Sequence, residues 1–231
     1  MIATMSRQEI KAEKPRTRQQ RRTSVTRQRL LDAARAVFAE KGLDLATIDD
    51  ITERADVGKG TFYYHFKSKE RLIRELIKRM LGELIATIDK KHNPEDDLPE
   101  ALDNLIGAHT EYFSNHWEDF VLFFQGRADL TLEQGYSGIE TPFMEYLERI
   151  EKLVDTSIER PISKPVLRRL ACAVAGFVSG YYSFAVIASE GEDVDETMRS
   201  LRGALVSSLT RFIKEAAPAT TESGDDNRVA W

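Results

Sequence analysis

The sequence predicts an all-α protein, and three observations support that fold class. Apolar residues recur three and four positions apart in segment after segment, which is the spacing of one helix face. We find no sustained alternation of apolar and polar residues bounded by hairpin turns, as strands would require. Glycine, proline or acidic clusters separate the apolar segments. With 231 residues, 42% of them hydrophobic, the chain can form one large domain or two modest ones.

Charge is unevenly distributed along the chain. Residues 1–80 hold 19 Lys and Arg against 11 Asp and Glu, whereas residues 81–231 hold 14 against 27. A basic block is usually a solvated surface, but on an acidic protein it also suits a nucleic acid, because Lys and Arg displace counterions from phosphates. The lone cysteine, Cys172, excludes an internal disulfide and a Cys-rich metal cluster, and it fits a reducing compartment such as the cytoplasm.

Two other segments bear on where the protein works. Residues 1–25 predict a basic, disordered arm, because their Lys and Arg are followed by no apolar stretch of the kind that a signal peptide has. Residues 170–189 contain no charge, which raises the alternative of a membrane-associated adaptor. Their many Gly, Ala, Ser and Tyr residues favour a buried helix, so we expect no membrane partner.

The first two helices are predicted from their caps and apolar stripes. Thr26 would cap a helix over residues 26–42, and Gly42 would end it. A short second helix follows Thr47, which forms a variant capping box with Asp50. The apolar stripe of the first helix consists of Leu30, Leu31, Ala34, Val37 and Phe38.

A turn and another short helix complete a helix-turn-helix pattern. Asp56 and Gly58 suit the turn, because both tolerate left-handed backbone. The helix over residues 59–65 is about 10 Å long and fits a major groove about 12 Å wide. Its inward face holds Phe62 and Phe66, four residues apart, and another face holds Lys59 and Tyr63.

These elements fill a longer pattern: Thr26, Leu30, Leu31, Ala33, Ala34, Phe38, Gly42, Thr47, Ile48, Ile51, Ala55, Val57, Gly60, Thr61, Phe62, Tyr63, Phe66, Lys69, Glu70 and Leu72. The pattern resembles the DNA-binding domain of the TetR family of transcriptional repressors. Two positions depart from the family: Thr52 stands where Ala is common, and Asp56 where Gly is common. Asp56 adds a negative charge near DNA and could change the affinity.

The resemblance implies a homodimeric repressor that binds a palindromic operator and responds to a small molecule. Residues 26–72 would be the three-helix DNA-binding domain, and residues 73–217 the larger helical domain for ligand binding and dimerisation. Packing on the next helix remains an alternative for Tyr64, and a structural role for His65. The expected DNA-binding residues are Thr26, Thr47, Gly58, Lys59, Gly60, Thr61, Tyr63, Tyr64, His65 and Lys69.

The remaining helices are placed by apolar spacing and by breakers. Ser68 would cap a long helix, and residues 218–231 would form a disordered tail. The expected helices span residues 69–91, 97–114, 117–134, 139–159, 164–189 and 193–216.

The last two helices predict the dimer interface. Gly176 and Gly180 lie four residues apart in a stripe of small residues that would let two backbones approach closely, although intrachain packing is the alternative. A dimer would also double the number of base pairs read. The expected interface residues are Ala173, Gly176, Gly180, Ser183, Leu201, Leu205, Leu209 and Phe212.

Aromatic residues are concentrated in the middle helices. Each one is most simply a core residue, but together they suggest a cavity for a hydrophobic or aromatic effector. The expected ligand residues are His109, Tyr112, His116, Trp117, Phe120, Phe124, Phe143, Phe177 and Tyr181.

An enzyme is the alternative from another class. The four histidines form no metal-binding His-Glu-x2-His pattern, and the chain has no phosphate-binding glycine loop or nucleophile elbow. We therefore expect no catalytic residues, no metal and no cofactor.

Overall fold

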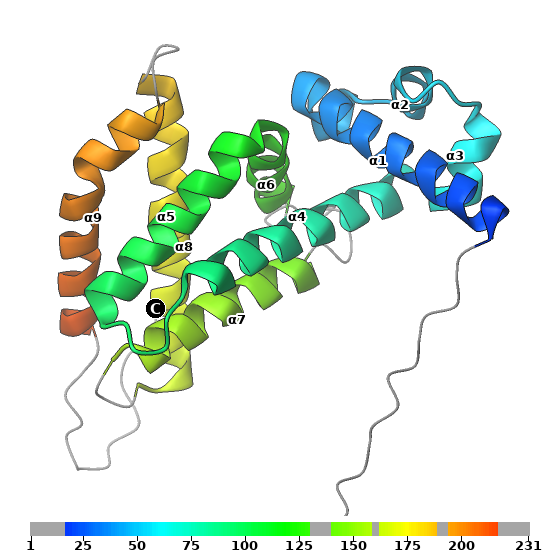
Figure 1. Ribbon diagram of the computed structural model, residues 1–231. Helices are drawn as coiled ribbons and strands as arrows, with labels where there is room; N and C mark the ends of the chain where they lie inside the picture. Colours follow the sequence, from blue (N-terminus) through cyan, green and yellow to red (C-terminus); the bar gives the residue numbers. More distant parts are fainter. Residues whose placement is uncertain (1–16, 130–139, 159–161, 189–193, 217–231) are drawn as a thin grey trace, which may run out of the picture.

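The computed structural model describes residues 17–129, 140–158, 162–188 and 194–216. These residues form helices and connecting turns, which confirms the all-α fold. Three helices make an N-terminal unit, and a long fourth helix leads from it into a bundle of five more (Figure 1). The helices are α1 (Arg18–Leu45), α2 (Ile48–Arg54), α3 (Lys59–Phe66), α4 (Lys69–Lys91), α5 (Leu98–Asn115), α6 (Trp117–Asp129), α7 (Glu140–Thr156), α8 (Lys164–Ala188) and α9 (Val194–Ala216).

The structure corrects the start of the first helix. α1 begins at Arg18, where Gln20 N–H donates to Thr17 Oγ1 at 3.2 Å and Thr17 N–H donates to Gln20 Oε1 at 2.8 Å. Thr26 therefore lies inside α1 and does not cap it, and the prediction of a disordered arm is wrong for residues 18–25. The apolar stripe that guided the prediction starts only at Leu30, because the first turns of α1 are exposed and need no buried face. Residues 1–16 lie outside the described part.

The predicted break at Gly42 is confirmed. Gly42 has φ 82° and interrupts the helical path of α1 shortly before its end. This left-handed conformation is available to glycine without steric cost. The chain can therefore turn at this point towards α2.

α4 links the two parts of the molecule and spans the predicted residues. Ser68 caps it, because its hydroxyl accepts the N–H of Arg71 at 3.3 Å. α4 packs against α5, α6 and α7 on one side and against α1 and α3 near its start. Its buried residues follow a helical stripe: Leu72, Ile73, Leu76, Ile77, Met80, Leu81, Leu84 and Ile88.

The other helices lie close to their predicted positions. Asp97 caps α5 with a capping box that includes Glu100, at the predicted start. α7 is shorter than expected, since it ends at Thr156 where Ser157 Oγ donates to the carbonyl of Leu153. Residues 130–139, which include the end of the helix expected to reach residue 134, lie outside the described part, as does the tail after Ala216.

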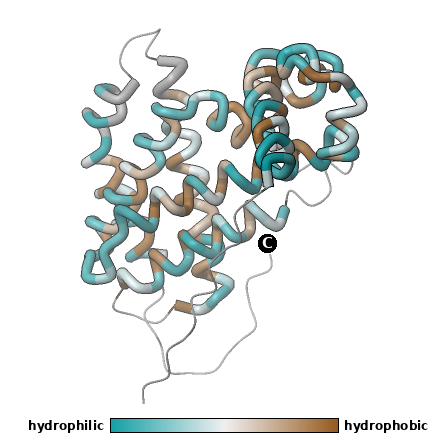
Figure 2. The backbone as a smooth tube through the Cα atoms, turned by 45° about the vertical axis from the view of Figure 1, so that its right-hand side comes forward, coloured by the Kyte–Doolittle hydropathy of each residue, from teal (hydrophilic) through white to brown (hydrophobic). Residues whose placement is uncertain are grey.

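An aromatic core joins the helices of the bundle. The ring of Phe113 on α5 lies 5.4 Å from Phe120 and 5.5 Å from Phe123 on α6, and 5.7 Å from Tyr182 on α8. Hydrophobic positions recur between hydrophilic ones along the helices in Figure 2. In the described part of the chain, no helix combines the length and apolar content needed to cross a membrane.

Candidate nucleic-acid interface

The start of α2 is fixed by a hydrogen-bonded cap. Thr47 Oγ1 accepts the N–H of Asp50 at 3.1 Å, and Asp50 Oδ2 accepts the N–H of Thr47 at 2.9 Å, which confirms the predicted capping box. Lys41 Nζ lies 2.6 Å from Asp50 Oδ1. Lys41 and the bonds to Thr47 lower the pKa of Asp50 to about 2, so this cap is charged at neutral pH.

Thr52, one of the two departures from the family pattern, is accommodated inside α2. Its side chain is buried, and its hydroxyl lies 2.9 Å from the carbonyl oxygen of Ile48 and 3.1 Å from that of Asp49. A buried hydroxyl costs little when it has such partners. The methyl group that Thr adds relative to Ala is thereby tolerated without an unsatisfied polar group.

The turn between α2 and α3 is a Schellman motif with an aspartate at its left-handed position. Val57 N–H donates to Thr52 O at 3.0 Å, and Asp56 N–H donates to Glu53 O at 3.0 Å. Asp56 has φ 51°, whereas Gly58 has φ −76°, so the left-handed residue is Asp56 and not Gly58. The side chain of Asp56 is exposed and lies 3.5 Å from Arg29.

α3 buries one face and exposes the other, as predicted. Phe62 and Phe66 are buried, whereas Tyr63 is 48% and Tyr64 69% exposed. Gly58 and Gly60 are also exposed, and a Cβ on Gly60 would meet nothing within 4 Å. The outer face of α3 is therefore largely open to solvent.

Lys59 sits on that outer face in an ion pair. Its Nζ lies 2.6 Å from Asp49 Oδ1, and both side chains are mostly exposed. The Asp49 carboxylate raises the pKa of Lys59, which keeps the ammonium charged. Such an exposed pair is weak, so Lys59 can exchange Asp49 for a base edge or phosphate at little cost. Thr61 lies half-buried beside it.

Three predicted DNA contacts lie in less open positions. Thr26 is half-buried within α1. His65 is also half-buried, and burial followed by the nearby Arg27 guanidinium lowers its pKa, so it is a neutral hydrogen-bonding group at pH 7. Lys69 Nζ donates to the carbonyls of Leu43, Asp44 and Ala46 at 2.9, 3.3 and 3.0 Å. In this structure Lys69 therefore holds the α1–α2 loop.

Arg27 is a structural residue that the sequence reading did not identify. Its guanidinium pairs with Glu75 on α4 and lies over the ring of Phe66, 4.9 Å from the centroid. Arg27 thus ties α1 to the end of α3 and to α4. The spacing of residues along α1 places Arg27 only on the polar face. It does not predict the contacts of Arg27 with Glu75 and Phe66, which are distant in sequence.

A second set of contacts joins the N-terminal unit to the bundle through α1 and α6. Arg35 Nε lies 2.9 Å from Asp119 Oδ1, and the Tyr112 hydroxyl donates to Asp119 Oδ2 at 2.7 Å. Asp119 is fully buried, and this burial raises its pKa although Tyr112 and Arg35 favour the charged form. Near the other end of α6, Gln125 Oε1 accepts the N–H of Leu43 at 3.0 Å.

The nine predicted ligand residues differ in exposure. His109, Tyr112, Phe120 and Phe143 are buried, and Tyr181 and His116 are half-buried. Trp117, Phe124 and Phe177 are instead 48%, 43% and 52% exposed. Amphipathic spacing identifies apolar residues but does not show which of them the neighbouring helices cover.

His109 is the most enclosed polar group of this set. Its Nδ1 lies 2.8 Å from Leu105 O, and its Nε2 lies 2.7 Å from the Tyr146 hydroxyl. A carbonyl can only accept, so Nδ1 carries the proton and Nε2 accepts from Tyr146. Burial lowers the pKa of His109 to about 4, and the ring is neutral at physiological pH.

Of the eight predicted dimer residues, two are exposed and four are half-buried. Gly176 is exposed, Ala173, Gly180, Ser183 and Leu205 are half-buried, and Phe212 is 42% exposed. Phe177 and Phe184 on α8 are exposed as well. Leu209 is buried within the chain and so belongs to its core, while the side chain of Leu201 lies outside the described part.

Comparisons with known proteins agree with this geometry. The family profile described as "Bacterial regulatory proteins, tetR family" matches residues 30–76. The chain is 31% identical over 138 residues to the HTH-type transcriptional regulator YvdT of Bacillus subtilis, and the match covers 60% of this chain and 70% of that protein. It is 30% identical over 142 residues to the HTH-type transcriptional repressor KstR2 of Mycobacterium tuberculosis, with 60% of this chain and 69% of that protein covered.

Solved structures show the same fold beyond the helix-turn-helix. FadR from Bacillus subtilis, in complex with stearoyl-CoA, aligns with a TM-score of 0.66 at 19% identity and covers 79% of this chain and 96% of that chain. FadR from Bacillus halodurans aligns with a TM-score of 0.62 at 20% identity, covering 81% and 94%. Both alignments therefore extend over most of the helical bundle.

Proposed function

Because the chain belongs to the TetR family of bacterial transcriptional regulators and is a DNA-binding regulator, we propose that it is a homodimeric repressor released from a palindromic operator by a hydrophobic effector. Proteins of this family are regulators and not enzymes. The observation that carries the proposal is the outer face of α3, where Lys59, Tyr63 and Tyr64 are exposed around Gly60. A protein that binds bacterial DNA works in the cytoplasm, where that DNA lies.

The outer face of α3 supplies both kinds of contact that operator binding needs. Lys59 reads a guanine edge through its ammonium group, and Tyr63 lies one turn away on the same face. Tyr64 holds the backbone through its phenol, and Thr47 presents the start of α2 to a phosphate. One α3 covers only a few base pairs, so two copies on a symmetric operator are required for specificity.

The exposed face of α8 and α9 suits the second copy. Gly176, Gly180 and Gly203 meet nothing within 4 Å if a Cβ is added, so none of them is explained by packing inside the chain. Exposed Phe177, Phe184 and Phe212 add apolar area beside these glycines. Small residues flanked by aromatic ones allow close approach of two backbones and bury apolar surface at the same time.

The effector enters the aromatic interior of the bundle in this proposal. His109, Tyr112, Phe120 and Phe143 contact neighbouring side chains there, so a ligand must move these rings apart. The FadR structure from Bacillus subtilis contains stearoyl-CoA. Long-chain acyl-CoA is therefore the first compound to test, followed by neutral aromatic compounds.

The α1–α6 contacts provide a path from the effector to the DNA. Tyr112 and Asp119 belong to the bundle, and Arg35 belongs to the DNA-binding unit, so a shift of α6 acts directly on α1. α4 also contacts both parts, so it carries a displacement of the bundle to α1 and α3. An effector that binds the DNA-incompetent spacing of the two α3 helices more tightly releases the operator by population shift.

Footprinting and sedimentation on the DNA upstream of the protein's own gene test the proposal. The wild type should sediment as a dimer and protect two half-sites about one helical turn apart. Gly180→Arg, whose Cβ would meet no atom within 4 Å, should yield folded monomers with strongly reduced operator binding. Thr141→Arg adds the same charge at an exposed position of α7 and serves as the control. A monomeric wild type that binds one half-site at full affinity would contradict the dimer.

A further inference from the structure

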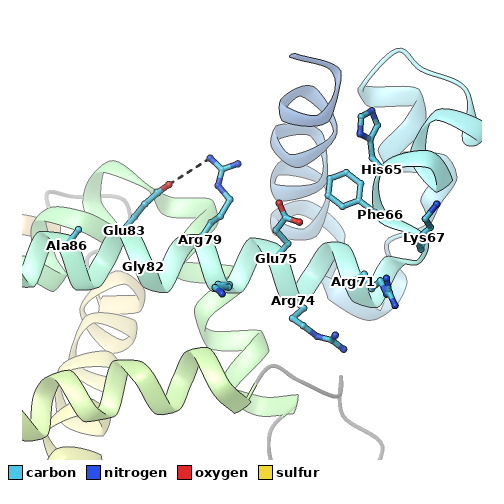
Figure 3. Close-up of a pocket in the computed structure, with 11 residues that line it drawn as sticks. His65, Phe66, Lys67, Arg71, Arg74, Glu75, Arg79, Gly82, Glu83 and Ala86 are labelled. Carbon is cyan, nitrogen blue, oxygen red and sulfur yellow. Dashed lines mark ion pairs between the residues drawn. The ribbon is translucent and has the colours of Figure 1, made fainter. Parts of the chain in front are cut away.

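A groove of about 910 Å³ runs along α4 from the end of α3. Figure 3 shows its lining: the last residues of α3 stand at one end, and successive turns of α4 continue away from them. His65 lines the groove, but Lys59, Tyr63 and Tyr64 of the outer face of α3 do not, and neither does His109 of the aromatic core. The groove's α4 residues share one side of the helix at helical spacing: Arg71, Arg74, Glu75, Lys78, Arg79, Gly82, Glu83 and Ala86.

The groove carries a strong excess of positive charge. Lys67, Arg71, Arg74, Lys78 and Arg79 line it, against the carboxylates Glu75 and Glu83. Those two acids already have partners, since Glu75 pairs with Arg27 and Glu83 lies 4.0 Å from Arg79 and 3.3 Å from the Tyr112 hydroxyl. Within the described ranges, Lys67, Arg71 and Lys78 have no carboxylate partner.

Gly82 is a second and independent feature of the groove. Glycine in the interior of a helix is less favourable than alanine. At Gly107 and Gly126, close neighbours within the chain favour glycine, because a Cβ would lie 2.6 Å from Arg202 and 2.7 Å from Ile77, respectively. A Cβ on Gly82 would meet nothing within 4 Å. Contacts with the described residues therefore do not explain this glycine, which leaves the groove open at this point.

The floor is less polar than the rim. Phe66 closes one end of the groove, and Gly82 and Ala86 expose backbone and a methyl group farther along α4. Lys67 stands at the mouth in a left-handed conformation, φ 64°, which is uncommon for a side chain of this kind. The site thus combines an apolar floor with cations of α4 and of the turn that follows α3.

We propose that this groove binds an organic anion, that is, an elongated molecule with an apolar body and a carboxylate, phosphate or sulfonate group. The anionic group lies between Arg71 and Lys78, and the apolar body lies over Gly82 and Ala86. Charge-assisted hydrogen bonds to two cations give the site its affinity for anions, and the open floor gives it a preference for an apolar body. Such a ligand touches both the last turn of the recognition helix and the linking helix.

Calorimetric titration with anilinonaphthalene sulfonate, an aromatic sulfonate of suitable chemistry, tests this site in the full-length protein. Arg71→Gln combined with Lys78→Gln should weaken binding at one site per chain by at least about tenfold. Gly82→Leu should abolish that site by filling the groove, while its thermal unfolding midpoint does not fall, because Leu is a better helix former than Gly. Lys90→Gln, at an exposed position of α4 outside the groove, should bind the sulfonate as the wild type does.

Two further probes separate the contributions of charge and apolar body. Phenylnaphthylamine, which lacks the sulfonate, and inorganic pyrophosphate, which lacks the apolar body, should each bind the wild type more weakly than the sulfonate. The proposal is overturned by a wild type without a saturable sulfonate site, or by Gly82→Leu and the double variant both binding like the wild type. None of these measurements involves DNA, so they are independent of the repressor proposal.

Discussion

Asp56 shows how much one residue decides at the turn of the helix-turn-helix. It occupies the left-handed position of the Schellman motif, with φ 51°, where glycine is the usual residue. Its exposed carboxylate also faces the side of the molecule that we assign to DNA, next to Arg29. Aspartate at this position therefore affects stability through the backbone and DNA affinity through its charge.

Two substitutions separate these effects. Asp56→Gly should raise the free energy of unfolding by about 1 kcal/mol because it removes the left-handed strain. Asp56→Asn should leave stability nearly unchanged, since Asn tolerates the same backbone. Both variants should bind the operator more tightly by losing a negative charge. Urea denaturation measures the stability, and mobility shifts at two salt concentrations measure the operator affinity. Equal stability of Asp56→Gly and Asp56→Asn would show that the left-handed backbone of Asp56 is not strained.

His109 predicts a pH dependence of stability. The unfolded chain takes up a proton on this ring near pH 6.5, whereas the folded chain does so only near pH 4, because the buried ring has a lowered pKa. The unfolded state binds more protons in this window, so the unfolding free energy should fall by about 3 kcal/mol as the pH drops through it.

Comparison with a variant isolates this contribution. His109→Gln also offers one donor group and one acceptor oxygen, but it does not titrate. Urea denaturation between pH 4 and 7 should therefore give a shallower decline for the variant than for the wild type. Parallel curves would show that His109 is accessible to protons in the folded protein.

At the scale of elements, helices and caps were readable from the sequence because they depend on neighbours within a few residues. Thr47 with Asp50, the break at Gly42 and the two faces of α3 are all local features, and each is confirmed. The start of α1 was missed because the prediction relied on an apolar stripe, which the exposed residues 18–25 lack.

Contacts between elements could not be read in the same way. Lys69 reaches the α1–α2 loop, and Arg27 reaches α4, over separations at which spacing carries no information. The burial of the predicted ligand residues could not be read for a related reason: an aromatic side chain at helical spacing is buried only if another helix covers it. Trp117 and Phe124 on α6 are exposed examples.

A substitution of Lys69 distinguishes its two roles, which are to hold the α1–α2 loop and to bind a DNA phosphate. Lys69→Met removes the donors to Leu43, Asp44 and Ala46, so it should lower the unfolding free energy by about 2 kcal/mol. Lys67→Met is the control, because Lys67 is an exposed neighbour without these bonds. A Lys69→Met variant of unchanged stability but weaker DNA binding would instead assign Lys69 to a phosphate.

At the scale of the whole molecule, the α1–α6 contact joins the DNA-binding unit to the bundle. Arg35 is the partner of a fully buried carboxylate, Asp119, whose other oxygen accepts from Tyr112. Removing one member of a buried pair leaves an uncompensated charge and costs about 3–5 kcal/mol. The contact is therefore suited to transmit a displacement of α6 to α1.

A double-mutant cycle tests this coupling. Arg35→Met should be strongly destabilised, and adding Asp119→Leu should recover much of that loss because no buried charge remains. The double variant should bind the operator but lose part of its response to the effector. Thermal unfolding and effector titrations of the protein–DNA complex are the measurements, and a full effector response in the double variant would place the coupling elsewhere.

The central claim is that the outer face of α3 binds DNA, and a quantitative mobility shift on the upstream region tests it most directly. Lys59→Ala combined with Tyr63→Ala should weaken binding at least about 100-fold, because both proposed DNA contacts are lost. The variant should remain folded, because both side chains are exposed. Lys90→Ala, which removes one cation far from α3, should bind as the wild type does. Wild-type affinity in the double variant would contradict the account.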